Sequence, residues 1–380
     1  MTPSPTVRLH GLGQSTWLDN INDGLIQSGT LARLIAEGSV YGVTSNPTIF
    51  KNAIGSGQFA YPTEIARLAS EGKRPEEIYD SLAVRDITRT ADLLRKPFES
   101  GTGRDGFVSL EVPPALSHDT AGTVAEAKRL WKLVARPNLF VKVPATAEGI
   151  PAIESLIGDG VSVNVTLIFS RRQYAEVAAA YRRGIERRLA AGGSLDGVHS
   201  VASVFVSRVD TSVDAEIEAR GGAAAGAEQE RLVGLRGKAA VANALDIWEE
   251  YRSRFFSPDF EKLRARGARP QWLLWASTGT KNKAYSDVKY VEELMGPDTV
   301  NTMPMDTLEA WLDHGVAAEN RLDPRIEAAR RTRRELAEAG ISLDEHCARL
   351  LVDGVRSFAQ SFDEMMAVVR ERSAALAPPR

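Results

Sequence analysis

Residues 139–146 read LFVKVPAT and place one lysine, Lys142, inside a short β-branched and aromatic run. Such a run predicts a buried strand, which in a barrel or a doubly wound sheet is apolar throughout. The lysine then has two interpretations. It ends the strand in an ion pair with a neighbouring carboxylate, which is the commoner arrangement for an isolated strand lysine, or it is a nucleophile. A desolvated lysine can become the neutral amine, which attacks ketones to give a Schiff base.

Seven further short apolar runs flank this one and alternate with longer helical patterns. Eight strands that are each followed by a helix predict the α/β class and a single (β/α)₈ barrel, in which catalytic residues lie at the carboxyl ends of the strands. The expected strands are 15–19, 40–44, 107–112, 139–144, 161–168, 198–206, 272–277 and 300–303. The long insertion between the second and third strands must wrap outside the barrel.

Helix ends are marked by capping residues and prolines. The expected helices include 76–94 opened by Pro75, one capped by Ser170 that runs through Leu189, and one bracketed by Ser286 and Gly296. Asp323-Pro324 opens another helix, whose solvated face carries Arg330, Arg331, Arg333 and Arg334 among glutamates.

A last helix should pack against the barrel. Ser342 and Glu345 form a capping box at its start. Its apolar residues recur every three or four positions and are Leu351, Val355, Phe358, Phe362 and Met366. We expect a mobile loop at 220–226 and disorder at 378–380.

Composition bounds the class of protein. The 380 residues exceed the roughly 250 of a typical barrel, but no Pro/Ser/Gly-rich linker divides them, so we expect one domain over 1–380 with a core at about 12–370. With 43% hydrophobic and 26% charged residues the chain resembles an ordinary soluble enzyme. The net charge is −3 and no part of the chain forms a basic domain, which argues against a nucleic-acid partner.

The expected compartment is the cytoplasm. Cys347 is the single cysteine, so no intrachain disulfide can form and a reducing compartment is expected. The first residues lack the apolar core of a signal peptide, and no stretch approaches the about 18 apolar residues of a membrane span. Membrane partners are therefore not expected.

Several familiar motifs are rejected. Gly101, Gly103 and Gly106 match G-x-G-x-x-G, but they follow a helix and precede a strand, the reverse of the dinucleotide-binding order, and so predict a turn. The five histidines are scattered without metal-ligand spacing, and neither a serine nucleophile elbow nor a Walker A loop occurs. We expect neither a metal nor a cofactor.

Polar residues recur where seven successive strands end. They are Asp19, Asn46, Glu111, Lys142, Asn164, Thr166, Ser203, Arg208, Ser277 and Lys281. Singly, each has a structural interpretation. Asn46 suits a turn before Pro47, Glu111 a strand terminus, and Arg208 a helix-cap pair with Asp210. Seven strand ends in succession instead predict that these groups converge on one barrel mouth.

Five segments resemble the strand motifs of transaldolase, in the same order. They are TSNPTIF at 44–50, SLEV at 109–112, FVKVPAT at 140–146, NVTLIFS at 164–170 and ASVFVSRVD at 202–210. The resemblance covers about residues 12–370 and is closest to the long bacterial type. It implies a class I aldolase barrel that uses no cofactor and moves a dihydroxyacetone unit from sedoheptulose 7-phosphate to glyceraldehyde 3-phosphate.

The resemblance also implies residue roles. Lys142 attacks the ketose carbonyl, Asp19 handles the proton of the C4 hydroxyl, and Glu111 with Thr166 holds a proton-shuttling water. The remaining substrate contacts are Asn46, Asn164 and Ser203 on the dihydroxyacetone hydroxyls, and Arg208, Ser277 and Lys281 on the phosphate.

Two positions bear on specificity. Many transaldolases carry a second arginine after the seventh strand, where this chain has Lys281, and Asn282 or Lys283 could share the phosphate contact. Phe205 lies two residues beyond Ser203 on the same face, and its ring brings no hydroxyl to protonate a carbanion. A fructose 6-phosphate aldolase that releases dihydroxyacetone, and a barrel that only binds sugar phosphates, remain as alternatives. The oligomeric state is left open.

Overall fold

The computed structural model describes residues 3–101, 103–222 and 225–374. Eight parallel strands pair in chain order and close into a barrel, with β1 beside β8. The predicted (β/α)₈ architecture is confirmed. The strands are β1 Gln14–Leu18, β2 Gly42–Val43, β3 Val108–Glu111, β4 Leu139–Pro144, β5 Val163–Ile168, β6 Ser200–Phe205, β7 Trp272–Ala276 and β8 Thr299–Met303.

All eight strands lie where the apolar runs predicted them, but several are shorter. β2 differs most, since only Gly42 and Val43 are strand where 40–44 was expected. Position 42 has no room for a larger residue, because a Cβ on Gly42 would lie 2.5 Å from the indole ring of Trp17. Beyond Val43 the chain turns at Asn46 to begin a helix at Pro47, so the pairing cannot extend.

Strand register sets the site residues side by side. Glu111 of β3 pairs with Lys142 of β4, which pairs with Asn164 of β5. Residues in register on parallel strands point to the same face, here the barrel interior. Towards the amino ends of the strands the interior is aromatic, with the rings of Phe107 and Phe140 stacked 4.3 Å apart and Trp17 beside both.

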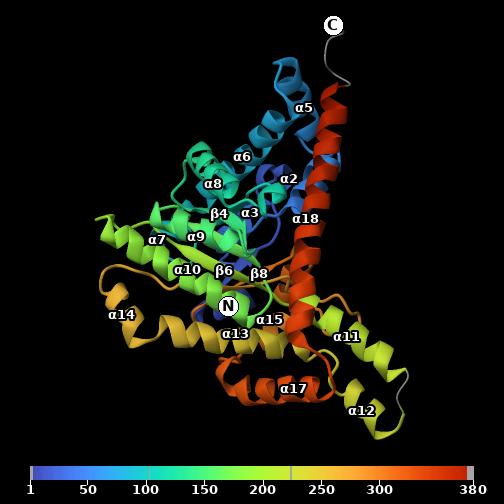
Figure 1. Cartoon of the computed structure of the whole chain (residues 1–380). Helices are drawn as coiled ribbons and strands as arrows, with labels where there is room; N and C mark the ends of the chain where they lie inside the picture. Colours follow the sequence, from blue (N-terminus) through green and yellow to red (C-terminus); the bar gives the residue numbers. More distant parts are fainter. Residues whose placement is uncertain (1–2, 102, 223–224, 375–380) are drawn as a thin grey trace.

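Helices surround the barrel (Figure 1). Those up to β3 are α1 Pro5–Gly11, α2 Asp23–Gln27, α3 Thr30–Ala36, α4 Pro47–Gly55, α5 Tyr61–Ser70, α6 Pro75–Leu93 and α7 Arg95–Ser100. Those between β3 and β7 are η1 Pro114–Leu116, α8 Thr120–Val134, α9 Gly149–Gly158, α10 Arg171–Ala190, α11 Ser207–Gly221, α12 Ala227–Val233, α13 Ala239–Phe255 and α14 Pro258–Arg264. The last are α15 Lys289–Glu293, α16 Met305–His314, η2 Asp323–Arg325, α17 Ile326–Glu338 and α18 Leu343–Ala374.

Most predicted helix starts are confirmed. Pro75 opens α6, and the Ser170 hydroxyl accepts a hydrogen bond from the Gln173 amide at 3.1 Å to cap α10. Asp323 and Pro324 form the 3₁₀ turn η2, after which α17 begins. The arginine face of α17 is largely solvated as expected, although Arg330 and Arg333 also pair with carboxylates of α13.

The helix expected between Ser286 and Gly296 is present but short. It is α15, which runs only from Lys289 to Glu293, with Val288 rather than Ser286 as its N-cap. Just beyond the helix, the Leu294 carbonyl accepts a hydrogen bond from the Gln14 side chain at 2.7 Å. Gly296 instead permits close packing, since a Cβ there would lie 2.2 Å from the Leu322 side chain.

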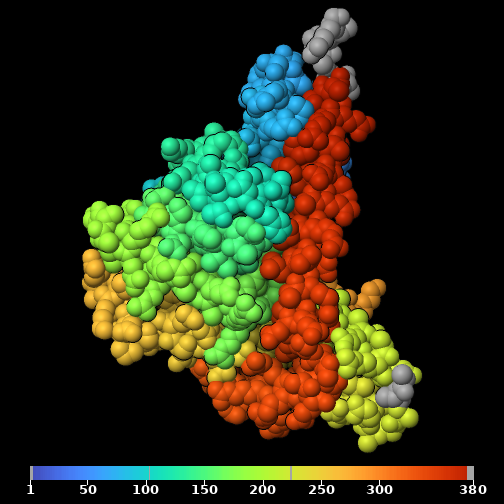
Figure 2. Space-filling view, viewed as in Figure 1, coloured from blue at the N-terminus to red at the C-terminus, as the bar shows by residue number. Residues whose placement is uncertain are grey.

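Helix α18 runs the length of the molecule, from α17 to α5 (Figures 1 and 2). Its start is capped by Ser342, whose hydroxyl accepts a hydrogen bond from the Glu345 amide at 3.3 Å. The predicted stripe faces inward, with Phe358 and Met366 buried and Leu351, Val355 and Phe362 half-buried against the core. The prediction that this helix packs on the barrel is confirmed.

The loops differ in how well they were predicted. Gly101, Gly103 and Gly106 form the expected turn between α7 and β3, and Gly106 has a φ of +82° with no room for a Cβ beside the Phe98 backbone. The expected loop at 220–226 begins too early, since α11 continues to Gly221. Residues 223–224 and 378–380 lie outside the described residues. Within the described chain, no helix combines the length and apolarity of a membrane span.

Candidate active site

Lys142 is buried at the polar end of the barrel interior, with 4% of its surface exposed. Its ammonium group donates a hydrogen bond to the Ser45 carbonyl at 3.0 Å and lies 3.5 Å from the Glu111 carboxylate. The centroid of the Phe358 ring, contributed by α18, is 5.9 Å away. The amine therefore has the predicted carboxylate neighbour, and it also lies in an enclosed setting that suits a nucleophile.

Glu111 is the carboxylate beside this amine. Burial raises the pKa of Glu111 from its ordinary 4.5 to about 7, against the opposing effect of the Lys142 charge. One of its oxygens, Oε2, is buried without a hydrogen-bond partner in the described chain, and so is the Thr166 hydroxyl. A carboxyl with this pKa can hold or release a proton near neutral pH, as a general acid or base requires.

Asp19 follows the last residue of β1. Its carboxylate accepts a hydrogen bond from the Thr44 hydroxyl at 2.6 Å, and that hydroxyl lies 2.6 Å from the hydroxyl of Thr302. Burial raises the pKa of Asp19, while the charges of Lys142 and Lys281 oppose the increase. The structure thus brings a second poised carboxyl within electrostatic reach of the amine.

A hydrogen-bonded row crosses the barrel on strands β3, β5 and β6. The Asn164 amide donates to the Ser109 hydroxyl at 3.0 Å, and the Ser203 hydroxyl donates to the Asn164 carbonyl oxygen at 2.7 Å. All three side chains are buried. The row orients the Asn164 amide and leaves it a second N–H that can donate to a ligand.

Asn46 has a structural role. Its side-chain oxygen accepts a hydrogen bond from the Ile49 amide at 3.0 Å and so caps α4. Asn46 is therefore a helix N-cap rather than the turn residue that was suggested, and its amide N–H₂ group keeps its donors for a further contact.

Arg208 stands in the first turn of α11 with no carboxylate at ion-pair distance among the described residues. Its guanidinium carbon lies 5.4 Å from the centroid of the Phe205 ring, and burial lowers the pKa of the arginine. The suggested pair with Asp210 is wrong, because Asp210 accepts instead from the Ala240 amide at 2.7 Å and the Tyr290 hydroxyl at 2.8 Å. A half-buried guanidinium without a counterion suits an anionic ligand.

Ser277 and Lys281 follow β7. Ser277 has a φ of +55°, a strained value for a residue with a side chain, and its hydroxyl lies 3.0 Å from that of Ser207. Lys281 is exposed and lies near enough to Asp19 for its charge to act on that carboxyl. Both residues therefore flank the same end of the barrel as Arg208 and Asp19.

Known proteins resemble the chain over nearly its whole length. A family model described as transaldolase/fructose-6-phosphate aldolase matches residues 16–369. The chain belongs to this family. A transaldolase of Thiobacillus denitrificans is 48% identical over 358 residues, which cover 94% of this chain and 97% of that protein. A transaldolase of Parafrankia sp. is 45% identical over 368 residues, which cover 97% and 98%. The resemblance expected from the five motifs is confirmed.

Some residues of this family member's site were not identified from the sequence. Thr44, Ser45 and Ser109 lie inside the quoted motifs and contact Asp19, Lys142 and Asn164 respectively. Phe358 lies far along the chain, and its apolar stripe predicted burial but not the partner it meets. Gly354 belongs with it, because a Cβ there would lie 2.9 Å from Leu167 and 3.7 Å from the Arg208 guanidinium.

Proposed function

We propose that the enzyme transfers a dihydroxyacetone unit from sedoheptulose 7-phosphate to glyceraldehyde 3-phosphate through a Schiff base on Lys142. The products are erythrose 4-phosphate and fructose 6-phosphate, as in the non-oxidative pentose phosphate pathway. The observation that carries the proposal is the buried Lys142 amine, 3.5 Å from a carboxyl whose pKa is raised to about 7, in a chain of this family. The names of its relatives support a transferase rather than a lyase.

The first half of the reaction builds an electron sink. The neutral amine of Lys142 attacks C2 of the ketose, and the carbinolamine then loses water to give an iminium ion. Glu111 is a suitable proton donor for the departing hydroxide because its pKa is about 7. A water between Glu111 and Thr166 would give a hydrogen bond to two polar atoms that otherwise have no hydrogen-bond partner in the described chain.

The second half breaks and remakes one carbon–carbon bond. Asp19 takes the proton of the C4 hydroxyl, the C3–C4 electrons pass to the iminium, and an aldehyde leaves. The remaining enamine attacks the aldehyde carbon of the acceptor, Asp19 returns its proton to the new hydroxyl, and hydrolysis of the iminium frees Lys142. Asn164, Ser203 and Asn46 would hold the three-carbon unit by its hydroxyls meanwhile.

The phosphate is assigned to Arg208, Ser277 and Lys281. Arg208 supports this best, because its guanidinium is partly desolvated and has no carboxylate partner among the described residues. Lys281 would add a point charge from an exposed position. Since the substrates are soluble sugar phosphates, we also propose a cytoplasmic enzyme without nucleic-acid or membrane partners.

Phe205 supports transfer over release of dihydroxyacetone. The enamine must wait for an acceptor, and an acid that protonates its carbon instead leads to hydrolysis. Phe205 is 6% exposed, and its ring packs against Phe169 at 5.3 Å and beneath Arg208. It brings no hydroxyl to the site.

The test is borohydride reduction in the presence of fructose 6-phosphate, followed by intact-mass measurement. A three-carbon adduct should form on the wild type and map to the peptide that contains Lys142. Lys142→Met should abolish it, whereas the control Lys132→Met, an exposed lysine on α8, should keep it. An adduct that persists in Lys142→Met would refute the assignment.

A further inference from the structure

A cavity of about 600 Å³ opens at the end of the barrel opposite Lys142. Its lining comes from α1, α3, the end of α6, α7 and the segments that lead into β2 and β3, so it lies at the amino ends of the strands. The aromatic layer of Trp17, Phe107 and Phe140 lies towards this end of the interior, and no residue of the proposed reaction lines the cavity.

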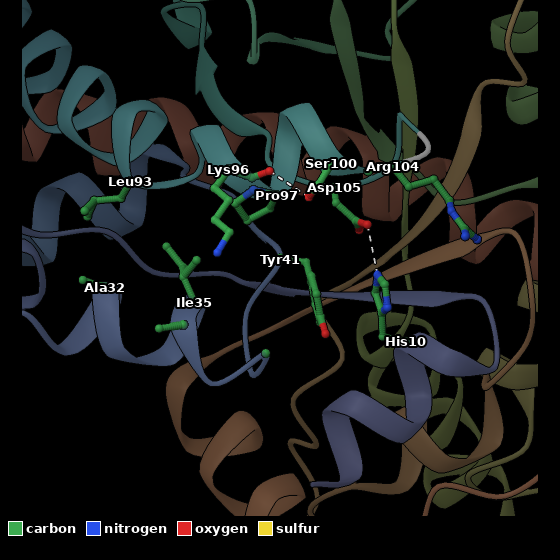
Figure 3. Close-up of a pocket in the computed structure, with 13 residues that line it drawn as sticks. His10, Ala32, Ile35, Tyr41, Leu93, Lys96, Pro97, Ser100, Arg104 and Asp105 are labelled. Carbon is green, nitrogen blue, oxygen red and sulfur yellow. Dashed lines mark hydrogen bonds and ion pairs between the residues drawn. The ribbon is translucent and has the colours of Figure 1, made fainter. Parts of the chain in front are cut away.

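Tyr41 forms a fixed flat wall of this cavity. The His10 ring stacks on one face of Tyr41 with centroids 3.9 Å apart and planes 13° from parallel. His10 is held in turn by Asp105 at 3.0 Å, and the other Asp105 oxygen accepts a hydrogen bond from the Ser15 hydroxyl at 2.6 Å. The second face of Tyr41 is turned towards Ile35 and Lys96 (Figure 3).

Lys96 supplies a positive charge to the same space. Figure 3 shows its amine directed between Ile35 and Tyr41, and no carboxylate of the described chain lies at ion-pair distance from it. Asp105 is already matched by His10 and Ser15. Arg104 is engaged at the far side, where it contacts the Gly13 carbonyl, Asp298 and the Trp272 ring. The cavity therefore carries an excess of positive charge beside a flat aromatic face.

The part of the cavity away from Tyr41 has apolar walls. Ala32 and Ile35 of α3 face Leu93 and Pro97 across the space. Its volume falls within the roughly 300–1,000 Å³ of small-molecule sites, which combine an apolar lining with a few placed polar groups. A ring that enters between Tyr41 and Ile35 would stack on one and bury surface against the other.

We propose that this cavity binds a small organic anion made of a flat ring and one phosphate or carboxylate group. The ring stacks on the exposed face of Tyr41 over Ile35, and the anionic group pairs with Lys96. Because the cavity lies at the opposite end of the barrel from Lys142, such a molecule is a ligand rather than a substrate of the Schiff-base reaction.

Calorimetric titration of the full chain tests the site with two probes, phenyl phosphate and benzoate. At least one should bind saturably, and phenol and inorganic phosphate should each bind at least about tenfold more weakly than that probe, because each lacks one half of the recognition. Lys96→Ala should weaken the probe by about tenfold or more, whereas the control Lys132→Ala should not. Ala32→Phe, which fills the cavity without changing charge, should abolish binding.

A second control separates this site from the barrel mouth. Arg208→Ala should leave the probe affinity unchanged, since Arg208 lies at the other end of the strands. Loss of binding in Arg208→Ala with retention in Lys96→Ala would place the probe at the substrate phosphate site and overturn the proposal. Absence of saturable binding by both probes, or wild-type affinity in Ala32→Phe, would overturn it as well. Circular dichroism of each variant confirms folding.

Discussion

The two ends of one barrel each hold a buried carboxylate, and the two are used differently. Asp105 at the amino end is 5% exposed and has both oxygens occupied, by Ser15 and by His10. Glu111 at the carboxyl end is 9% exposed, and its Oε2 has no hydrogen-bond partner in the described chain. Burial raises the pKa of Glu111 to about 7. Asp105, with both oxygens hydrogen-bonded, is therefore a structural group, whereas Glu111, which lies 3.5 Å from the Lys142 amine, keeps an oxygen available for proton transfer.

The largest effect should come from Lys142→Ala. Removal of the nucleophile should abolish transfer, by about 10⁴-fold or more, and leave the fold intact because the strand exchanges a charge for a small apolar group. Steady-state assay of erythrose 4-phosphate measures it. The matched change at the other end, Asp105→Asn, should lower stability and still permit the trapped adduct. Residual transfer within tenfold of wild type in Lys142→Ala would disprove the Schiff-base role.

Asp19→Ala should separate the two halves of the reaction. Loss of general acid–base help costs typically 10²–10⁴-fold, here in carbon–carbon cleavage, while iminium formation on Lys142 should continue. Rapid-quench measurement of cleavage, alongside borohydride trapping, resolves the two steps. A variant that forms no adduct would give Asp19 a different role.

Glu111→Gln tests the contrast between Glu111 and Asp105 through the pH dependence of the unfolding free energy. Between pH 4.5 and about 7 the folded protein keeps a proton on Glu111 that the unfolded chain has lost. The stability from this group is thus complete below pH 4.5 and is lost as pH rises through 7. Relative to Glu111→Gln, the wild type should lose about 1.4 kcal/mol of unfolding free energy per pH unit in this window. Urea denaturation at several pH values measures it, and parallel profiles would contradict it.

Arg208→Ala should act on substrate binding. The KM for phosphorylated sugars should rise roughly 10- to 100-fold, because a charge-assisted contact worth about 1.5–3 kcal/mol is lost, and that for unphosphorylated dihydroxyacetone should hardly change. Lys281→Ala should have the same effect more weakly, since its amine is exposed. Initial-rate kinetics with both substrate types measure it. Equal effects on the two types would move these residues away from the phosphate.

The smallest change in rate, but a change of product, is expected for Phe205→Tyr. A phenol beside the enamine would supply an acid, so the variant should release free dihydroxyacetone and lose transfer efficiency. The ratio of dihydroxyacetone to erythrose 4-phosphate in the purified variant is the measurement. An unchanged ratio with lower stability would mean that Phe205 only packs against Phe169 and Arg208.

Local pattern was enough for the strands and for the proposed catalytic side chains. Glu111, Lys142 and Asn164 each lie within an apolar run, which predicted their strands, and the register of the paired strands then sets the three side chains side by side. Asn46 and Arg208 show the limit. Asn46 caps a helix, and Arg208 has no carboxylate partner among the described residues. Both properties depend on neighbouring side chains that the apolar runs do not specify.

The sequence by itself determined the barrel, its order of strands and the family. The hydrophobic periodicity, the polar residues near the strand ends and the five motifs are all local properties of the chain. Only the tertiary structure decided that α18 brings Phe358 to 5.9 Å from Lys142, and that Lys96 and Tyr41 share a cavity at the other end. Such contacts join segments many residues apart. They depend on helix direction and side-chain packing, which hydrophobic period leaves open.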